Sequence, residues 1–171
     1  DVDEIVTKIS KEDRKQLRPL GIKIGRYHIF LPKMLKPKAV SLRILLWKFF
    51  NEIKKGNEIP QSGLNFLIDE YKKFNTKFLL LCGFERFKNF YVRVDILEKL
   101  FLEIIKNTEK GKFKVNSNMM NLLGSTKQNF YELIKIMNYK KDNNKEDVFF
   151  YIRQKKKKNI KFTKKINNPF S

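Results

Sequence analysis

The feature that most constrains the fold of this chain is Gly124, a single glycine between two helical segments that a hairpin follows. A helix-turn-helix unit needs a small residue at its sharp turn and a capped second helix. Apolar spacing predicts the first helix over 117–123 and the second over 126–137. Two strand-like runs, 139–141 and 148–152, then flank a polar loop. This order predicts a winged helix-turn-helix, because a bare three-helix bundle has no such hairpin.

A strand and a longer helix complete this unit at its N-terminal side. Aromatic and β-branched residues over 90–94 predict the strand. Helical spacing over 96–107 predicts the helix, with an apolar face of Leu97, Leu100, Phe101, Ile104 and Ile105. In the last helix the predicted core residues are Phe130, Leu133, Ile134 and Met137. Polar caps mark the helix starts, namely Asp95 with Glu98, Asn116 or Ser117, and Ser125 with Gln128.

The first third of the chain contains the signals of a second, smaller lobe. A capping box of Ser10 and Asp13 predicts a short helix, and alternation over 22–31 predicts a strand or hairpin arm. Pro37 is placed as the first-turn proline of a further helix. The apolar residues that recur at helical spacing along it are Val40, Ile44, Trp47, Phe50 and Ile53.

Breaker-rich residues 56–63 separate the two lobes. After them, the ambiguous stretch 64–74 is interpreted as a short helix, and Asn75 caps another over 76–82. We therefore expect a helix-rich α+β fold in three regions. They are an N-terminal helix/hairpin/helix lobe over 1–58, a winged-helix-like lobe over 64–153, and a disordered basic tail over 154–171.

The charge of the chain points to polyphosphate partners. Lys and Arg number 38 against 18 Asp and Glu, which gives a net charge of +20 and a pI of about 10.0. Such a surface attracts nucleic acid, because each neutralised phosphate releases condensed counterions. A bias toward Lys, Asn, Ile and Phe enriches lysine but does not explain its excess over acids. An anionic membrane surface or an acidic protein is the alternative partner.

Residue patterns for catalysis and for metal binding are missing. No Gly-x-x-x-x-Gly-Lys-Ser/Thr loop occurs, so these residues have no phosphate cradle for ATP. His28 and Cys82 are the only histidine and cysteine, which argues against a zinc site. A lone cysteine without a secretion leader favours a reducing cytoplasm, and no apolar stretch spans a bilayer. The first residue, Asp1, and the last, Ser171, suggest a fragment of a longer chain.

Two stretches resemble a known family. Residues 20–32, LGIKIGRYHIFLP, with Leu35-Lys36-Pro37 after them, resemble the pattern LGVRxGxxxxFLPxLLKP. Residues 92–100, VRVDILEKL, resemble VRVDMLERL. Both occur, in this order, in the C-terminal region of bacterial superfamily 2 (DExH-type) helicases similar to the mitochondrial degradosome RNA helicase of the suppressor-of-var type. In that family a helical segment like 120–139 and a basic tail ending in a Pro-Phe motif also follow, here Asn168-Pro169-Phe170.

The resemblance implies an upstream ATP-dependent helicase motor with its Walker loop, ATP and Mg, in a cytoplasmic bacterial protein that acts on RNA. It assigns no cofactor and no catalytic residue to this region. The sequence departs from the family by carrying more Lys than Arg and by the extra stretch 64–74. The excess of Lys weakens any expectation of bidentate base recognition.

Candidate nucleic-acid-binding residues lie on the second helix of the turn, on the wing and in the tail. They are Lys127, Asn129, Tyr131 and Lys135 on the helix, Lys140, Lys141 and Lys145 on the wing, and Lys155, Lys156, Lys157 and Lys158 in the tail. Each group has an ordinary alternative, namely a winged helix that docks protein and a tail that is only solvated.

Three further candidates lie outside the winged-helix unit. Arg26 and Tyr27 pair a cation with an aromatic ring that can stack on an unpaired base, although half-buried sheet is the commoner role of such a strand. Arg93 is a phosphate ligand or, more commonly before a helix cap, the partner of a nearby acid.

These patterns predict a non-catalytic, monomeric accessory region of an ATP-dependent RNA helicase that holds RNA near the motor by electrostatics. The expected partners are RNA, alternatively DNA, and the missing helicase core, with no membrane contact. Two alternatives stay open: a stand-alone winged-helix DNA-binding regulator, and a module that docks the helicase core.

Overall fold

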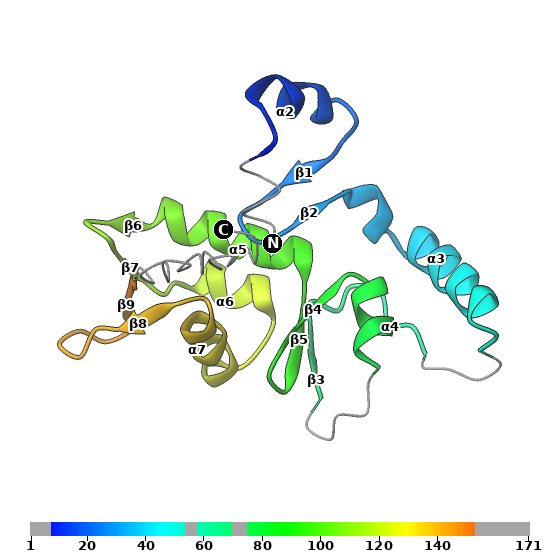
Figure 1. Cartoon of the computed structure of the whole chain (residues 1–171). Helices are drawn as coiled ribbons and strands as arrows, with labels where there is room; N and C mark the ends of the chain where they lie inside the picture. The colour runs from blue at the N-terminus through cyan, green and yellow to red at the C-terminus, as the bar shows by residue number, and fades with distance from the viewer. Residues whose placement is uncertain (1–7, 54–57, 70–74, 153–171) are drawn as a thin grey trace, which may run out of the picture.

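A computed structural model of the chain describes residues 8–53, 58–69 and 75–152, which form an α+β structure with three small sheets (Figure 1). The helical elements are α2 (Lys11–Leu17), the 3-10 helix η1 (Pro32–Leu35), α3 (Pro37–Phe50), α4 (Thr76–Leu81), α5 (Val94–Lys106), α6 (Ser117–Leu123) and α7 (Lys127–Ile136). The strands are β1 (Lys23–Ile24), β2 (Ile29–Phe30), β3 (Phe66–Ile68), β4 (Phe84–Phe87), β5 (Phe90–Arg93), β6 (Thr108–Glu109), β7 (Lys112–Lys114), β8 (Tyr139–Lys141) and β9 (Val148–Tyr151).

The winged-helix prediction is confirmed by the order of elements and strands. Helix α5 leads through the β6–β7 hairpin to α6 and α7, and the β8–β9 hairpin follows as the wing. Strand β9 pairs with both β7 and β8, which gives the sheet order β6-β7-β9-β8. Gly124 ends α6 at φ 65°, a conformation that glycine adopts without strain, and its N–H donates to Met120 O. The predicted α+β class with a winged-helix-like unit therefore holds.

Two capping predictions for this unit are wrong. Helix α5 starts at Val94, with Arg93 as its N-cap residue, so Asp95 and Glu98 lie inside the helix and do not cap it. Helix α7 is capped by Thr126, whose hydroxyl accepts from the N–H of Asn129, and not by Ser125 with Gln128. Both errors arise because neighbouring residues offer equivalent polar groups. The Asn116 cap of α6 is confirmed.

The stretch 64–74 contains a strand where a helix was predicted. Residues of β3 pair antiparallel with β5, and residues 70–74 lie outside the described structure. Strand β4 and the β6–β7 hairpin were not predicted at all. Strand β4 pairs with β5 across a tight turn at Lys88, which has φ 43°. The central sheet is therefore three-stranded, in the order β3-β5-β4.

Two hydrophobic cores lie on opposite faces of this central sheet. Successive strand residues point to opposite faces, so Phe90 and Val92 of β5 join the winged-helix core whereas Tyr91 joins a second core. That second core contains Val40 and Ile44 of α3 together with residues of α4 and β4. Helix α3, assigned by sequence to the N-terminal lobe, thus packs on elements beyond the predicted boundary.

The predicted core residues of the winged-helix unit are largely confirmed. The four residues of the α7 stripe are buried, and so are three of the five on α5; Phe101 is half-buried and Ile105 is exposed. On α3, Val40 and Ile44 are buried and Trp47 is half-buried, whereas Phe50 is exposed, contrary to prediction.

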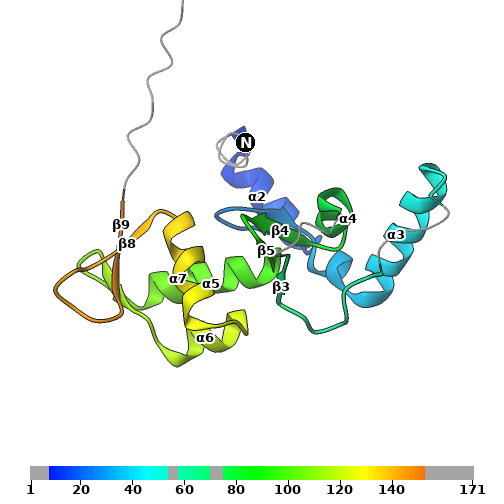
Figure 2. The same cartoon turned by 90° about the horizontal axis from the view of Figure 1, so that it is seen from below.

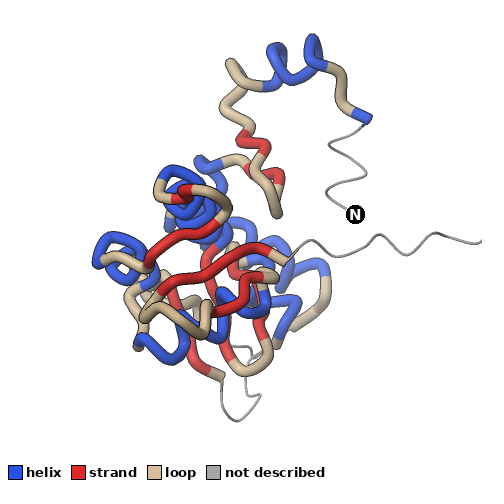
Figure 3. Tube along the Cα trace, turned by 90° about the vertical axis from the view of Figure 1, so that its left-hand side faces the viewer, coloured by secondary structure: helices blue, strands red, loops and turns tan. Residues whose placement is uncertain are grey.

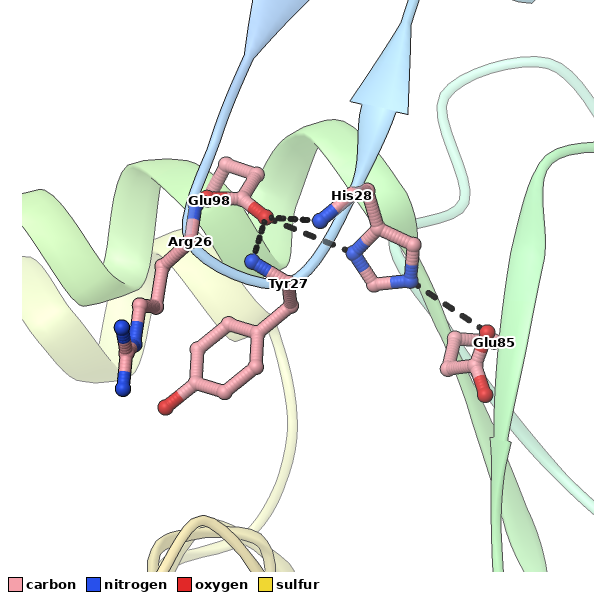
Figure 4. A network of polar contacts seen from close by, with 5 residues as sticks. All are labelled: Arg26, Tyr27, His28, Glu85 and Glu98. Atoms are coloured by element: carbon pink, nitrogen blue, oxygen red, sulfur yellow. Dashed lines mark hydrogen bonds and ion pairs between the residues drawn. The ribbon is translucent and has the colours of Figure 1, made fainter. Parts of the chain in front are cut away.

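A buried carboxylate joins the β1–β2 hairpin to α5 (Figure 4). Glu98, which is 7% exposed, accepts hydrogen bonds from the backbone N–H groups of Arg26 (2.7 Å), Tyr27 (2.8 Å) and His28 (2.8 Å). Three backbone donors offset the cost of removing the charge from water. Burial raises the pKa of Glu98, but the His28 side chain and then these backbone N–H groups outweigh burial and hold the pKa below its ordinary value.

Gly25 permits this contact. A Cβ atom built at residue 25 would lie 2.2 Å from the Glu98 carboxylate, so a side chain there displaces the carboxylate from its backbone donors or pushes the hairpin and α5 apart. The stretches 20–32 and 92–100 thus meet at Gly25 and Glu98.

We predict that Glu98→Gln lowers the free energy of unfolding by about 2 kcal/mol, because a neutral amide oxygen replaces a charged acceptor of several donors. Gly25→Ala should destabilise the chain to a similar or greater extent through the steric clash. Urea denaturation followed by circular dichroism measures both, with Glu109→Gln on exposed β6 as the control. If Glu98→Gln and Gly25→Ala had the same unfolding midpoint as the control, the proposed stabilising contact between Glu98 and the hairpin would be contradicted.

Candidate nucleic-acid interface

Helix α7 presents its predicted binding residues on the faces that its core stripe leaves uncovered. Lys127 and Lys135 are exposed, whereas Asn129 and Tyr131 are half-buried. The wing lies beside α7 at one end of the molecule, as Figures 1 and 2 show. Figure 3 views the molecule from this end, with the wing strands toward the reader. Helix and wing together therefore form one continuous candidate surface.

Asp147 of the wing links the wing to α7. Its carboxylate accepts a hydrogen bond from the Tyr131 hydroxyl and forms an ion pair with Lys127 Nζ at 2.7 Å. These two donors, Lys127 first, hold the pKa of Asp147 below its ordinary value, and the same contact raises the pKa of Lys127. Two of the predicted contact residues are thus already occupied by an internal anion.

Tyr131 also lies between two cations. The Nζ atoms of Lys127 and Lys141 are 5.6 and 5.5 Å from its ring centroid, within the range of a cation–π contact. The aromatic ring, two ammonium groups and the carboxylate of Asp147 therefore form a compact cluster at the junction of α7 and the wing. We call these four residues the Asp147 cluster.

The outer face of the wing sheet carries a row of basic and aromatic residues. The strand register places Lys112, Phe150 and Lys140 opposite one another on β7, β9 and β8. Lys112 forms an ion pair with Asp142 at 2.6 Å. Phe150 is half-buried and Lys140 is exposed. A half-buried aromatic ring flanked by ammonium groups is the arrangement that single-stranded nucleic acid uses for stacking and phosphate contact.

Exposed lysines lie on the β6–β7 and β8–β9 hairpins and on α7. Among the residues that the structure describes, several of them form no ion pair with a carboxylate. They are Lys110, Lys114, Lys135, Lys140, Lys141 and Lys145. The strand register places Lys114 and Lys140 on the same face as Phe150, whereas Lys141 is opposite buried Phe149 and its Nζ contacts the Tyr131 ring. Lys110 and Lys114 belong to the unpredicted β6–β7 hairpin, and Lys145 lies in the β8–β9 loop. The predicted tail residues 155–158 lie outside the described structure.

The three predicted residues outside the winged-helix unit are engaged in structural contacts. Arg93 donates two hydrogen bonds to Asp95, at 2.8 and 2.7 Å, as the alternative interpretation of this arginine expected. Tyr27 is half-buried and packs edge-on against Phe101, with ring centroids 5.4 Å apart. Arg26 lies in the same β1–β2 loop and donates its backbone N–H to Glu98. Arg26 and Tyr27 therefore help to position the hairpin and lie close to Tyr139 of β8, at the base of the wing. Arg93 is held by Asp95 at the start of α5.

His28 connects three elements in the same region. Its Nε2 lies 3.3 Å from the Glu85 carboxylate on β4, and its Nδ1 lies 3.4 Å from that of Glu98 on α5 (Figure 4). Burial lowers the pKa of His28, but hydrogen bonding to Glu85 and Glu98 outweighs burial and raises the pKa to about 9. His28 is thus protonated at neutral pH and stabilises the two carboxylates. It also lines a mainly apolar pocket of about 380 Å³ with Tyr27 and Phe87.

Sequence reasoning missed the two carboxylates that organise these regions. Glu98 was interpreted as a helix cap, and Asp147 only as part of the polar loop between the two strands of the wing. No local sequence pattern marks either carboxylate. The missed β6–β7 hairpin did have a local signal: Lys110 and Gly111 both adopt positive φ, and a residue followed by glycine is typical of such a two-residue turn.

No family model, curated protein or solved structure matches this chain. In the described ranges, no three His, Cys, Asp or Glu residues are grouped so that they could hold a metal ion. The helices described include none with the length and apolar character needed to cross a membrane.

We predict that stability falls as the pH rises through about 9, where His28 loses its proton. The pKa is higher in the folded chain than the unfolded value of about 6.5, so this contribution is fully present below pH 6.5 and is lost above pH 9. Thermal unfolding between pH 6 and 10 measures the effect. In His28→Asn the loss across this window should be smaller, and an identical loss in both chains would contradict the assignment.

Proposed function

We propose that this chain is a non-catalytic RNA-binding accessory region of an ATP-dependent helicase, and that it holds single-stranded RNA near the motor through phosphate contacts. The observation that carries the proposal is the set of exposed lysines without a carboxylate partner on the two hairpins of the winged-helix unit, with Phe150 between Lys112 and Lys140. The net charge of +20 adds long-range attraction for any polyphosphate. The proposed setting is the cytoplasm, and ATP and Mg belong to the motor.

The chemistry of the surface favours phosphate contact over base recognition. The cations on the wing are lysines, which act as point charges, whereas bidentate recognition of base edges is mainly the work of arginine. On α7, the side chains of Lys127 and Tyr131 are already bonded to Asp147. A sequence-specific DNA regulator needs such side chains free to contact bases, so this geometry favours the RNA-holding role over the regulator.

The link to a helicase rests on the family resemblance, and one contact supports it. Glycine and glutamate recur in the two family patterns at the positions of Gly25 and Glu98, which here touch. Unrelated sequences would match both patterns and also bring them into contact only by coincidence. The sequence immediately upstream of Asp1 tests this link, because a helicase motor there is expected.

We predict that affinity for a single-stranded RNA oligomer falls steeply between low and moderate salt. Replacing Lys114, Lys140 and Lys145 with Gln removes three exposed wing cations and should reduce the slope of log K against log salt by about 2. A matched variant with Lys33, Lys77 and Lys88 replaced has the same net charge but leaves the wing intact. Fluorescence anisotropy with labelled RNA measures the slopes.

Equal slopes for the two triple variants would place the phosphate contacts elsewhere, and no binding at low salt would refute the proposal. Deleting residues 154–171 should reduce the slope of log K against log salt further, because this segment contains seven lysines and no acidic residue. Competition with duplex DNA separates the RNA-holding role from the regulator, which prefers one duplex by a large factor.

The Asp147 cluster gives a separate prediction. Asp147→Asn should increase RNA affinity about threefold to tenfold at low salt, because it releases Lys127 and Tyr131 for the RNA backbone. Asparagine tolerates the backbone of residue 147, which has φ 58°. The control is Glu146→Gln, an equal change of charge at the adjacent, exposed residue. Equal affinity gains in the two variants would mean that only net charge matters, and a loss in Asp147→Asn would contradict the released-donor argument.

A further inference from the structure

Helix α3 has two apolar faces, and the structure covers only one of them. Val40 and Ile44 are buried against α4, and Trp47 packs on Phe78 with ring centroids 6.2 Å apart. The other face remains exposed to solvent. Its residues follow the i, i+3, i+4, i+7, i+8 spacing of a single helical stripe and are Leu42, Leu45, Leu46, Phe49 and Phe50. We call these five residues the α3 stripe.

The exposure of the α3 stripe is high for such large apolar groups. Leu45 is 64% exposed, and Phe49 and Phe50 are each 79% exposed. The two phenyl rings contact each other edge to face at 6.0 Å and form the end of the stripe. The stripe covers two helical turns, roughly 12 Å along the axis. Contiguous exposed apolar surface of this kind marks an interaction site.

The charge along α3 and the segment before it is positive. From Arg14 to Lys48 the sequence has no Asp or Glu, and Lys38, Arg43 and Lys48 lie on α3 itself; Glu52, two residues past Phe50, is the first acid after the helix. The N-terminal approach to the helix adds Lys33 and Lys36. A surface that fits this one must therefore combine apolar side chains in its middle with carboxylates at its edge.

We propose that the α3 stripe is a docking site for another protein that presents an acidic amphipathic helix. Helices recognise such a stripe through anchors at the same spacing, and carboxylates on the partner meet the flanking lysines. In Figures 1 and 2, α3 and the wing lie at opposite ends of the molecule, so the two surfaces can be occupied together. The site is thus distinct from the proposed RNA surface.

Three other occupants fit less well. A second copy of this chain would bring Lys38 and Lys48 against identical cations. RNA bases stack on phenyl rings but offer no aliphatic surface for Leu42, Leu45 and Leu46. A helix lying on an anionic membrane keeps its opposite face in water, whereas the opposite face of α3 is fixed in a protein core.

The test uses two synthetic amphipathic helical peptides with the same leucine stripe, one flanked by glutamates and the other by lysines. Fluorescence anisotropy measures their binding to the full chain at physiological salt. The glutamate peptide should bind at least about tenfold more tightly than the lysine peptide. Leu45→Gln, alone and with Phe49→Gln, should weaken that binding by about tenfold or more. The control is Leu102→Gln, an equally exposed leucine on α5.

Several results would overturn the docking site. They are no binding of the glutamate peptide, equal binding of both peptides, and an equal loss in the Leu102 variant. Self-association in sedimentation that Leu45→Gln abolishes would make a second copy the occupant, and stripe-dependent binding to phosphatidylserine vesicles but not to the peptide would make it a membrane. RNA affinity of the Leu45 variant should be unchanged, so failure of docking and failure of RNA binding are read separately.

Discussion

The buried carboxylate of Glu98 is the contact on which the arrangement of the two halves depends. It accepts hydrogen bonds from three backbone N–H groups of a loop about seventy residues away in sequence. Gly25 has no side chain, which leaves space for the carboxylate. Because a buried charge without these donors costs several kcal/mol, hairpin and helix are held in one geometry. His28 adds a cation between Glu98 and Glu85, and its contact with Glu85 of β4 also ties the hairpin to the central sheet.

The central sheet separates two surfaces of the molecule. One face supports the winged-helix unit, whose wing presents unpaired lysines beside Phe150, and the other supports α3. An internal anion, Asp147, occupies the position beside Lys127 and Tyr131 where a phosphate oxygen would receive the same donors. The wing thus has cations for a polyphosphate chain at its outer face and a competing carboxylate at its inner edge. On this account, RNA affinity is set by the balance of the two.

The sequence predicts features that depend on neighbours along the chain. The caps at Ser10, Asn75 and Asn116, the turn at Gly124 and the core stripe of α7 are all present. Features that depend on distant partners were missed. Stretch 64–74 was interpreted as a helix because only pairing with β5 makes Phe66–Ile68 a strand, and Asp95 with Glu98 matches a helix cap in sequence although both carboxylates bind elsewhere. For the same reason the lysines of the wing were predicted, but the carboxylate that restrains Lys127 was not.

Mapping of the RNA contact on the protein tests the central claim most directly. Ultraviolet cross-linking of the full chain to single-stranded RNA at low salt, followed by mass spectrometry of the linked peptides, identifies the residues in contact. The account predicts links on the β7 and β8–β9 strands, including Phe150, and on the basic segment 154–171. Links confined to the β1–β2 loop and α3, or no links at all, would contradict it.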